Sequence, residues 1–344
     1  MIDISHKRTS LRYARAVGTL HATPGIIERV RAGTVPKGDV ASVARSAGIL
    51  TAKRASEWLV FCHSMPVDWV EVRMELGQER IVFTAEVRSV WKTGMEMEAM
   101  TAVSAALLNA YDMLKPLQDQ EDLWIGEIRL EEKRGGKSDM TDRFPEGLRA
   151  AIVIVSTAKK EGKRADRAGD AIRGFLSGQP VTVAEDVYVE QDAGRLAEVL
   201  KKLSDGGGDR DRDGDGGAGR DAGRDRDRIG VSEGGGDQDG GNAGVGDQEP
   251  VDLVFVCGAT GPTPGDISAQ VIREVSNKLI PGIGEAMRSY GYQRTPFAML
   301  SEQVAGLRGG TLLLALPGSQ RGAEESLNAL FPGVLHLFRM LRGK

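Results

Sequence analysis

Two charged residues of the stretch YDMLK have the types and the spacing for proton transfer beside a phosphate. Asp112 and Lys115 are three residues apart, so on a helix they share one face. A carboxylate next to an ammonium group can transfer a proton and stabilise a leaving phosphate. An ordinary ion pair on an exposed helix is the alternative, and the spacing alone favours that alternative.

Further candidate residues stand near glycines or short turns in the first half of the chain. The string GGKS at 135–138 is not a phosphate-binding P-loop, because Glu131 stands where that motif requires a glycine. His63, next to Cys62, can be a catalytic base, a zinc ligand or a packed histidine. Zinc is the weakest of these interpretations because no second ligand follows at zinc spacing. The lysines in such stretches are Lys37, Lys53 and Lys133.

In the second half, a glycine-rich turn with the sequence CGATGPTPGD follows the apolar run VDLVFV and precedes a predicted helix. Backbone N–H groups at such a helix N-terminus can bind a phosphate. A tight strand-to-helix turn without a ligand is the alternative, and the turn alone does not separate the two. The later motifs IPGIGEAMR, TPFAMLSEQVAG and LPGSQ favour a binding site.

The elements that must position these residues differ between the two halves. Residues 70–76 and 81–90 are β-rich and are joined by the turn-like GQER, which predicts an antiparallel hairpin. Apolar residues at helical spacing between Glu96 and Lys115 predict a helix. Strands and helices grouped in this way are typical of an α+β layer.

The second half contains the continuous apolar run AIVIVS at 151–156 and the largely apolar stretches VDLVFVCG and TLLLALPG, which begin at 251 and 311. Strands that are apolar on both faces are typical of a parallel sheet covered by helices on either side. The polar stretch SDMTDRFPEG indicates a domain boundary near 139–147.

A low-complexity segment from Ser204 to Glu249 interrupts the second half. It holds 16 glycines, 13 acidic residues, 6 arginines and no aromatic residue, so it cannot bury enough apolar surface to fold. We predict a disordered insert in a domain that is otherwise continuous in space. Its net charge of −7 leaves the rest of the chain near +3, since the whole chain carries −4. That small excess suits phosphorylated small molecules and argues against a nucleic-acid groove.

Length and composition narrow the class of protein. With 344 residues the chain is long enough for two domains. No stretch approaches the ~20 apolar residues of a membrane span, and the polar N-terminus is unlike a signal peptide, so we expect a cytoplasmic protein. Two cysteines and four histidines exclude a disulfide framework and make a dedicated metal site unexpected.

The first half resembles the MoaC family of cyclic pyranopterin monophosphate synthases over nearly all of residues 1–139. The motifs that carry the resemblance are DISHKRTSLRYARA, AGTVPKGDVASVARSAGILTAKRASE, CHSMP, TGMEMEAMTAVSAALLNAYDMLK and IRLEEKRGGKS. The resemblance implies conversion of 3',8-cyclo-7,8-dihydro-GTP into cyclic pyranopterin monophosphate, with release of pyrophosphate and without a cofactor. The catalytic residues that it implies are Asp112, Lys115, Lys53 and Lys133. The substrate-binding residues that it implies are Arg12, Lys37, His63, Glu96, Met97 and Glu98.

The second half resembles the molybdopterin-binding MoaB and MogA family over residues 148–341, apart from the insert. Catalytic members of this family adenylylate molybdopterin, so the resemblance implies a pterin site with Mg²⁺ and ATP as candidate cofactors. The pocket residues that the motifs imply are Asp166, Gly258, Thr260, Gly261, Asp266, Glu285, Ser301, Pro317 and Gly318.

Several positions of this chain depart from the second family. Ala259 stands where the family has a glycine, and Gly265 and Glu302 stand where it has arginines. Gln191 stands where an aspartate would hold a metal-bound nucleotide. Either Asp192, one residue later, replaces that aspartate, or the domain is a non-catalytic module for pterin binding and assembly.

The sequence therefore predicts an α+β, ferredoxin-like N-terminal domain and an α/β three-layer second domain with a mostly parallel sheet. The predicted limits are 1–139 for the first domain, 140–147 for a linker, 148–203 with 250–344 for the second domain and 204–249 for the insert. The expected partners are pterin and nucleotide substrates and further copies of the chain, as a hexamer or trimer, because both families usually form oligomers. Neither nucleic acid nor a membrane is an expected partner.

Overall fold

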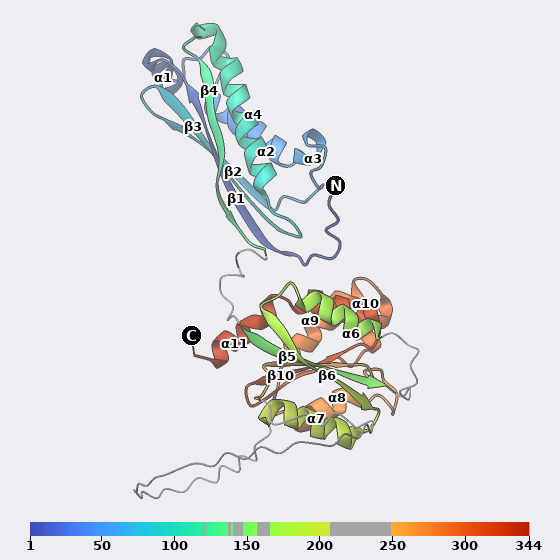
Figure 1. The fold of residues 1–344 in the computed structure, drawn as a ribbon. Coiled ribbons are helices and arrows are strands. Elements are labelled where there is room, and N and C mark those ends of the chain that lie inside the picture. Colours follow the sequence, from blue (N-terminus) through green and yellow to red (C-terminus); the bar gives the residue numbers. More distant parts are fainter. Residues whose placement is uncertain (120, 137–138, 140–146, 157–165, 207–248, 344) are drawn as a thin grey trace, which may run out of the picture.

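The computed structural model describes residues 1–119, 121–136, 139, 147–156, 166–206 and 249–343. These residues form two sheets, one of four strands in the first half and one of six strands in the second (Figure 1). Except for their terminal residues, the predicted linker and insert lie outside the described residues.

The first sheet has the order β2-β3-β1-β4, and all its neighbouring strands are antiparallel. The elements in this half are β1 (Ser10–His21), α1 (Pro24–Arg31), α2 (Val40–Ala52), α3 (Ala55–Trp58), β2 (Trp69–Leu76), β3 (Arg80–Trp91), α4 (Glu96–Leu114), the 3-10 helix η1 (Lys115–Leu117) and β4 (Trp124–Arg134). The predicted hairpin is confirmed as β2 and β3, and the predicted helix as α4.

Helix α4 packs its apolar stripe closely against β1. A Cβ atom on Gly18 would lie 2.6 Å from Val103 Cγ1 and 2.7 Å from Leu107 Cδ1, so only glycine allows this approach. On its other side α4 packs against α2, where a Cβ on Gly48 would lie 3.0 Å from the Ala102 carbonyl oxygen. Since α4 is fixed by a sheet and a helix, both of its ends are held at defined positions.

The second sheet has the order β6-β5-β7-β10-β9-β8. Strands β6, β5, β7 and β10 are parallel, whereas β9 and β8 are antiparallel, so the sheet is mixed. The elements in this half are β5 (Leu148–Ser156), α6 (Arg167–Leu176), β6 (Val181–Glu190), α7 (Ala193–Asp205), β7 (Leu253–Cys257), α8 (Ser268–Val275), β8 (Lys278–Leu279), α9 (Pro281–Tyr292), η2 (Pro296–Leu300), β9 (Ala305–Arg308), β10 (Thr311–Leu316), α10 (Gln320–Leu330), η3 (Gly333–Leu335) and α11 (His336–Leu341).

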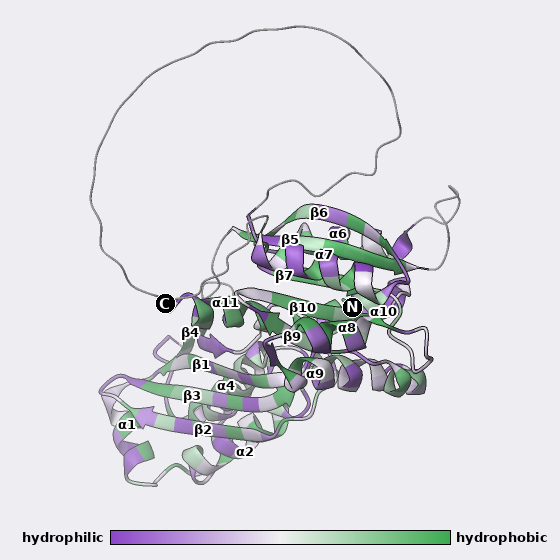
Figure 2. Cartoon of the chain, turned by 90° about the horizontal axis from the view of Figure 1, so that it is seen from below, coloured by the Kyte–Doolittle hydropathy of each residue, from purple (hydrophilic) through white to green (hydrophobic). Residues whose placement is uncertain are grey.

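Helices cover both faces of the second sheet. Helices α6, α9 and α10 pack on one face, and α7 and α8 pack on the other (Figure 1). Strands β7 and β10 are buried along their whole length and are apolar, whereas the edge strand β6 alternates between apolar and polar residues (Figure 2). The predicted buried strands are thus confirmed. Within the described ranges, no helix is long and apolar enough to cross a membrane.

Candidate functional sites

A cluster of charged residues lies at the C-terminal end of α4. The Asp112 carboxylate accepts from two ammonium groups, with Lys115 Nζ 2.9 Å from Oδ1 and Lys37 Nζ 2.7 Å from Oδ2. Lys37 Nζ also donates to the main-chain carbonyl of Asp112 at 2.7 Å. The hydrogen bonds from Lys115, which has the larger effect, and from Lys37 lower the pKa of Asp112 to about 2. The structure thus brings together Asp112 and Lys115, as their spacing predicts, and adds Lys37 from a distant part of the chain.

A second cluster lies at the N-terminal end of α4. Lys133 Nζ on β4 lies 3.5 Å from Glu96 Oε1. Arg12 on β1 donates to the carbonyl oxygens of Trp91 and Lys92 at 3.3 and 3.4 Å. Desolvation lowers the pKa of Arg12, and the nearby Glu96 carboxylate opposes that shift. Positive and negative side chains from β1, β4 and α4 therefore meet at this end of the helix.

The same end of α4 carries a buried carboxyl group. Glu98 is 3% exposed, its Oε1 accepts from Cys62 Sγ at 3.6 Å, and its Oε2 has no hydrogen-bond partner in the described part of the chain. Burial raises the pKa of Glu98. Glu96 and Met97 directly precede Glu98, and His63 directly follows Cys62. Four of the predicted pocket residues, Glu96, Met97, Glu98 and His63, therefore lie at this end of α4. A buried carboxyl oxygen without a partner is a group that a bound donor would satisfy.

The Cys62 thiol should react slowly with alkylating reagents. Burial and the Glu98 charge raise the pKa of Cys62 to about 11. Because a free cysteine has a pKa near 8.5, we expect labelling by iodoacetamide at pH 8 to be about 100-fold slower than that of a free thiol. Glu98→Gln removes the charge and should accelerate labelling, measured on tryptic peptides by mass spectrometry.

The other cysteine serves as an internal control for this measurement. Cys257 is buried in the second domain, with a pKa of about 12, so its labelling rate should be the same in both proteins. Equal Cys62 rates in wild type and Glu98→Gln would show that the carboxylate does not act on the thiol.

The two clusters do not meet within one chain. Glu96 and Asp112 both belong to α4, and their separation of 16 positions corresponds to about 24 Å at the rise of an α-helix. Lys53 is the C-cap residue of α2, and no salt bridge between described residues joins it to either cluster. The residues implied for one catalytic site are therefore divided within a single copy.

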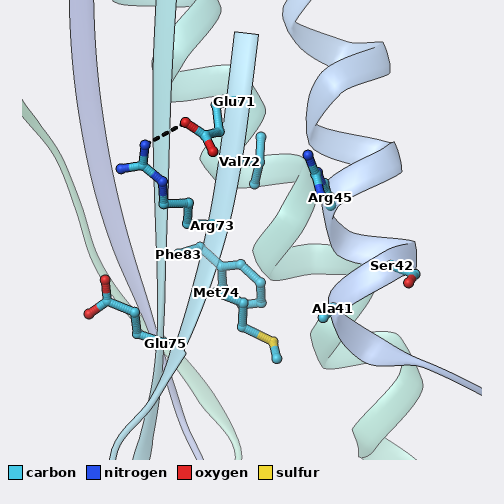
Figure 3. A pocket seen from close by; sticks show the side chains of 9 residues that line it. All are labelled: Ala41, Ser42, Arg45, Glu71, Val72, Arg73, Met74, Glu75 and Phe83. Carbon is cyan, nitrogen blue, oxygen red and sulfur yellow. Dashed lines mark hydrogen bonds and ion pairs between the residues drawn. The ribbon is translucent and has the colours of Figure 1, made fainter.

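Cavities formed by described residues open on the N-terminal half. One of about 390 Å³ lies between α2 and β2 and contains none of the predicted site residues (Figure 3). The guanidinium of Arg73 at its wall is already paired with Glu71 and Glu86. The other cavity, of about 460 Å³, is lined by His63 and Thr93 together with residues of the N-terminus. This second cavity adjoins the N-terminal end of α4.

In the second domain, the glycine-rich turn follows β7 at the carboxyl ends of the parallel strands. Gly258 has a φ of +100°, and a Cβ on it would lie 2.4 Å from the Val155 carbonyl oxygen on β5. A Cβ on Gly318, after β10, would lie 3.1 Å from Gly258 Cα. The buried Ser268, which the sequence did not single out, donates from Oγ to the Gly258 carbonyl at 2.7 Å. Glycine is thus required where these two loops cross.

Several other predicted residues surround this crossing. Cys257 Sγ donates to the Pro317 carbonyl at 3.2 Å, and the charge of Asp166 contributes to the raised pKa of Cys257. The Glu302 amide donates to the Thr260 carbonyl. The neighbouring Ser301 has a buried Oγ without a hydrogen-bond partner among the described atoms. The structure therefore brings most of the residues of the predicted pterin pocket together at the carboxyl ends of the parallel strands. The exposed Glu285 on α9 is an exception, since no contact between described residues links it to the turn.

The carboxylates nearest the turn are engaged within the protein. Asp266 accepts from the amide and the hydroxyl of Thr263, which lowers its pKa. Asp192 is the N-cap of α7 and accepts from a first-turn amide at 2.7 Å. Gln191 donates from Nε2 to the Gly265 carbonyl. Two of the positions that depart from the family pattern thus contact each other.

This set of groups fits a magnesium-bound nucleotide poorly. Magnesium in such sites is bound through carboxylate oxygens. Here the amide of Gln191 stands at the position of the expected carboxylate, and the carboxylates of Asp192 and Asp266 already accept hydrogen bonds from the protein. Among the residues that the structure describes, no group of three or more His, Cys, Asp or Glu side chains could hold a metal ion. The glycine turn and the unpartnered Ser301 hydroxyl remain suited to a hydrogen-bonding ligand.

Comparisons with known proteins match both halves of the chain. A model of the MoaC family matches residues 1–136, and a model described as a probable molybdopterin binding domain matches residues 243–336. A molybdenum cofactor biosynthesis bifunctional protein of Chlorobaculum tepidum is 30% identical over 343 residues, which cover 100% of this chain and 95% of that protein.

Two further relatives each cover part of this chain. A cyclic pyranopterin monophosphate synthase of Streptomyces griseus is 42% identical over 148 residues, covering 43% of this chain and 82% of the relative. The crystal structure of the molybdopterin biosynthesis enzyme MoaB from Thermus thermophilus is 32% identical, with a TM-score of 0.42, and covers 58% of this chain and 98% of its own.

Proposed function

The chain belongs to the family of bifunctional molybdenum cofactor biosynthesis proteins, and on that premise we propose that its N-terminal domain is a cyclic pyranopterin monophosphate synthase. This domain rearranges 3',8-cyclo-7,8-dihydro-GTP to cyclic pyranopterin monophosphate and releases pyrophosphate, without a cofactor. The observation that carries the proposal is the exposed Asp112 carboxylate held between the ammonium groups of Lys37 and Lys115.

The geometry divides the chemical roles within this cluster. A carboxylate with a pKa of about 2 is a weak base, so Asp112 acts by holding two ammonium groups in place rather than by accepting a proton first. The lysines stabilise the negative charge of the triphosphate and protonate the leaving oxygen. Lys133 beside Glu96 supplies a further ammonium group at the other end of α4.

The separation of the two clusters supports a site shared between copies of the chain. Because about 24 Å of helix lies between Glu96 and Asp112, a homo-oligomer must place the N-terminal end of one α4 near the C-terminal end of another. The exposure of Asp112 and Lys115, 56% and 53% of their side chains, leaves them available to a neighbouring copy. A hexamer or a trimer satisfies this requirement.

The second domain binds molybdopterin at the turn between β7 and α8. The crossing of Gly258 and Gly318, with Thr260, Ser301 and Asp166 around it, supports this assignment. Because Asp192 and Asp266 accept hydrogen bonds from the protein itself, the site favours binding of molybdopterin without rapid ATP-dependent adenylylation. The other candidate, a full adenylyltransferase, requires Asp192 to leave the N-cap of α7 and bind the metal.

Gln191→Asp should raise adenylylation of molybdopterin by about tenfold or more, the scale of one charge-assisted contact. The measurement is the formation of adenylylated molybdopterin by the full-length protein with magnesium ATP. Wild type should be slow or inactive because an amide lacks the charge that magnesium requires.

Asp192→Asn is the matched control, because asparagine also caps a helix well and the variant loses only the charge. If wild type adenylylates rapidly and Asp192→Asn alone stops the reaction, Asp192 has taken over the role and the second domain is an enzyme. Activity gained only in Gln191→Asp supports the binding module.

The N-terminal half has a ferredoxin-like fold in this proposal. Helices α1, α2 and α3 lie between β1 and β2, and α4 lies between β3 and β4. This arrangement, with the strand order β2-β3-β1-β4, supports a ferredoxin-like fold. The domain limits are 1–139, and 148–203 with 250–344 around the insert.

A further inference from the structure

The first eight residues, which we name the N-terminal strap, connect the two domains. The strap has no helix or strand of its own and runs between the domains before the chain enters β1 (Figure 1). A turn within it is closed by the Lys7 amide, which donates to the Ile4 carbonyl at 3.0 Å.

The C-terminal part of α9 and the loop that follows it bind the main chain of the strap. The Tyr290 hydroxyl donates to the His6 carbonyl at 2.5 Å, and Arg294 Nη2 donates to the Ser5 carbonyl at 2.8 Å. The guanidinium of Arg294 also lies 3.4 Å from the centre of the Tyr290 ring and donates to the Tyr290 carbonyl at 2.7 Å. Tyr290 is 6% exposed, and its ring and carbonyl hold the Arg294 guanidinium in place.

The strap contributes its own donor to the second domain. Arg8 Nη1 and Nη2 donate to the carbonyls of Ala329 and Phe331 at 2.6 and 3.0 Å. These carbonyls lie at the C-terminal end of α10, where a helix presents unpaired acceptors and a cation is favoured. Desolvation lowers the pKa of the Arg8 guanidinium, which reflects its enclosed position.

The other side of the strap lines the cavity beside the cluster at the N-terminal end of α4. The residues around this cavity of about 460 Å³ are Met1, Ile2, Ile4, Lys7, Phe61, His63 and Thr93. Thr93 follows Lys92, whose carbonyl accepts from Arg12 in the cluster at the N-terminal end of α4. Lys7 and His63 are the basic side chains of the wall, and Lys7 belongs to the strap.

We propose that the second domain positions the strap, and through it Lys7, for substrate binding at the N-terminal end of α4. Arg8, Tyr290 and Arg294 are positioning residues, and Lys7 adds an ammonium group to the triphosphate site that Lys37 and Lys115 of a neighbouring copy complete. The inference rests on the proposed synthase function for the identity of that substrate. A strap released from the second domain would sample many positions, and the apparent affinity would fall with the fraction of time that the strap is docked.

The test uses full-length Tyr290→Phe and Arg294→Ala proteins, which remove one donor each, and Arg321→Ala as a control. Arg321 also lies on the surface of the second domain, but it pairs within α10 with Glu325. Hydrogen–deuterium exchange of strap amides reports docking, and steady-state kinetics report KM and kcat for the synthase reaction. Binding of inorganic triphosphate reports the anion site without turnover.

Both donor variants should expose the strap to faster exchange and raise KM by up to about tenfold, the equivalent of one hydrogen bond, with kcat unchanged. Triphosphate binding should weaken by the same factor, and Lys7→Ala should weaken it without changing strap exchange. The control should match wild type in every measurement.

Unchanged exchange in Tyr290→Phe and Arg294→Ala would show that the second domain does not hold the strap. Faster exchange with unchanged KM and unchanged triphosphate affinity would show that the strap has no part in binding. A wild type without synthase activity would reject the proposed function instead, while the exchange and triphosphate measurements would still decide the positioning role.

Discussion

Asp112→Asn should lower the rate of cyclic pyranopterin monophosphate formation by about 100-fold or more, the usual effect of losing an electrostatic contact at a reacting centre. The amide cannot hold the ammonium groups of Lys37 and Lys115, which now lie 2.7 and 2.9 Å from the carboxylate oxygens. The melting temperature should stay the same, because the side chain is 56% exposed and outside the apolar stripe of α4. Product formation is measured by mass spectrometry.

An ion pair of the same kind on another helix provides the control. Glu28 and Arg31 form an exposed i,i+3 pair on α1, and Glu28→Gln should leave the rate unchanged. Because the pKa of Asp112 is about 2, protonation of this carboxylate should not reduce the wild-type rate down to pH 5. Full turnover by purified, folded Asp112→Asn would remove the residue from the catalytic role.

The same variant tests whether the site is shared between copies. Glu96→Gln, at the other end of α4, should also lose activity. Chains carrying one substitution each, co-expressed with different affinity tags and purified through both, should regain part of the activity, because some sites then combine two intact halves. Mixed oligomers as inactive as either parent would mean that each chain contributes a whole site or none.

Gly258→Ala should destabilise the second domain by about 2–6 kcal/mol, the sum of backbone strain and overpacking. A φ of +100° is unfavourable for alanine, and its Cβ would lie 2.4 Å from the Val155 carbonyl of β5. That oxygen belongs to a strand with neighbours on both sides and cannot move away without breaking the sheet. Calorimetry of the full-length protein should show the loss in the melting of the second domain, by about 2–4 °C per kcal/mol.

Gly174→Ala should raise the stability of the same domain instead of lowering it. Gly174 lies in α6, is exposed, and a Cβ on it would meet no atom within 4 Å. Alanine there should stabilise the domain by up to about 1 kcal/mol, because glycine loses more backbone entropy in a helix. Similar melting of both variants would show that space and φ at Gly258 do not limit the choice of residue.

Sequence alone predicted the elements whose signals are local. The hairpin of β2 and β3 follows from β-rich segments around a short turn, and α4 follows from apolar residues at helical spacing. Strands β5, β7 and β10 follow from continuous apolar runs. Strand β1 was not predicted, because its buried residues include Ala14, Ala16 and Gly18, small residues that favour strands weakly but make room for α4.

The candidate site was predicted only as far as short spacing reaches. Asp112 and Lys115 are close because three residues make almost one helical turn. That Lys37 completes this cluster, and that Glu96 lies far from it at the other end of α4, depend on how helices and strands pack. Periodicity shows which face of an element is buried, but it does not show which distant element lies against it.

The link between the domains depends on tertiary structure most of all. Ser5 and His6 lie nearly 290 residues before Arg294 and Tyr290 in the chain, and only main-chain carbonyls of the strap take part in these two contacts. Every residue offers the same main-chain carbonyl, so no pattern of side chains indicates such a partner. The sequence determined two folded halves with their own chemistry, whereas packing decided that one holds the N-terminus of the other.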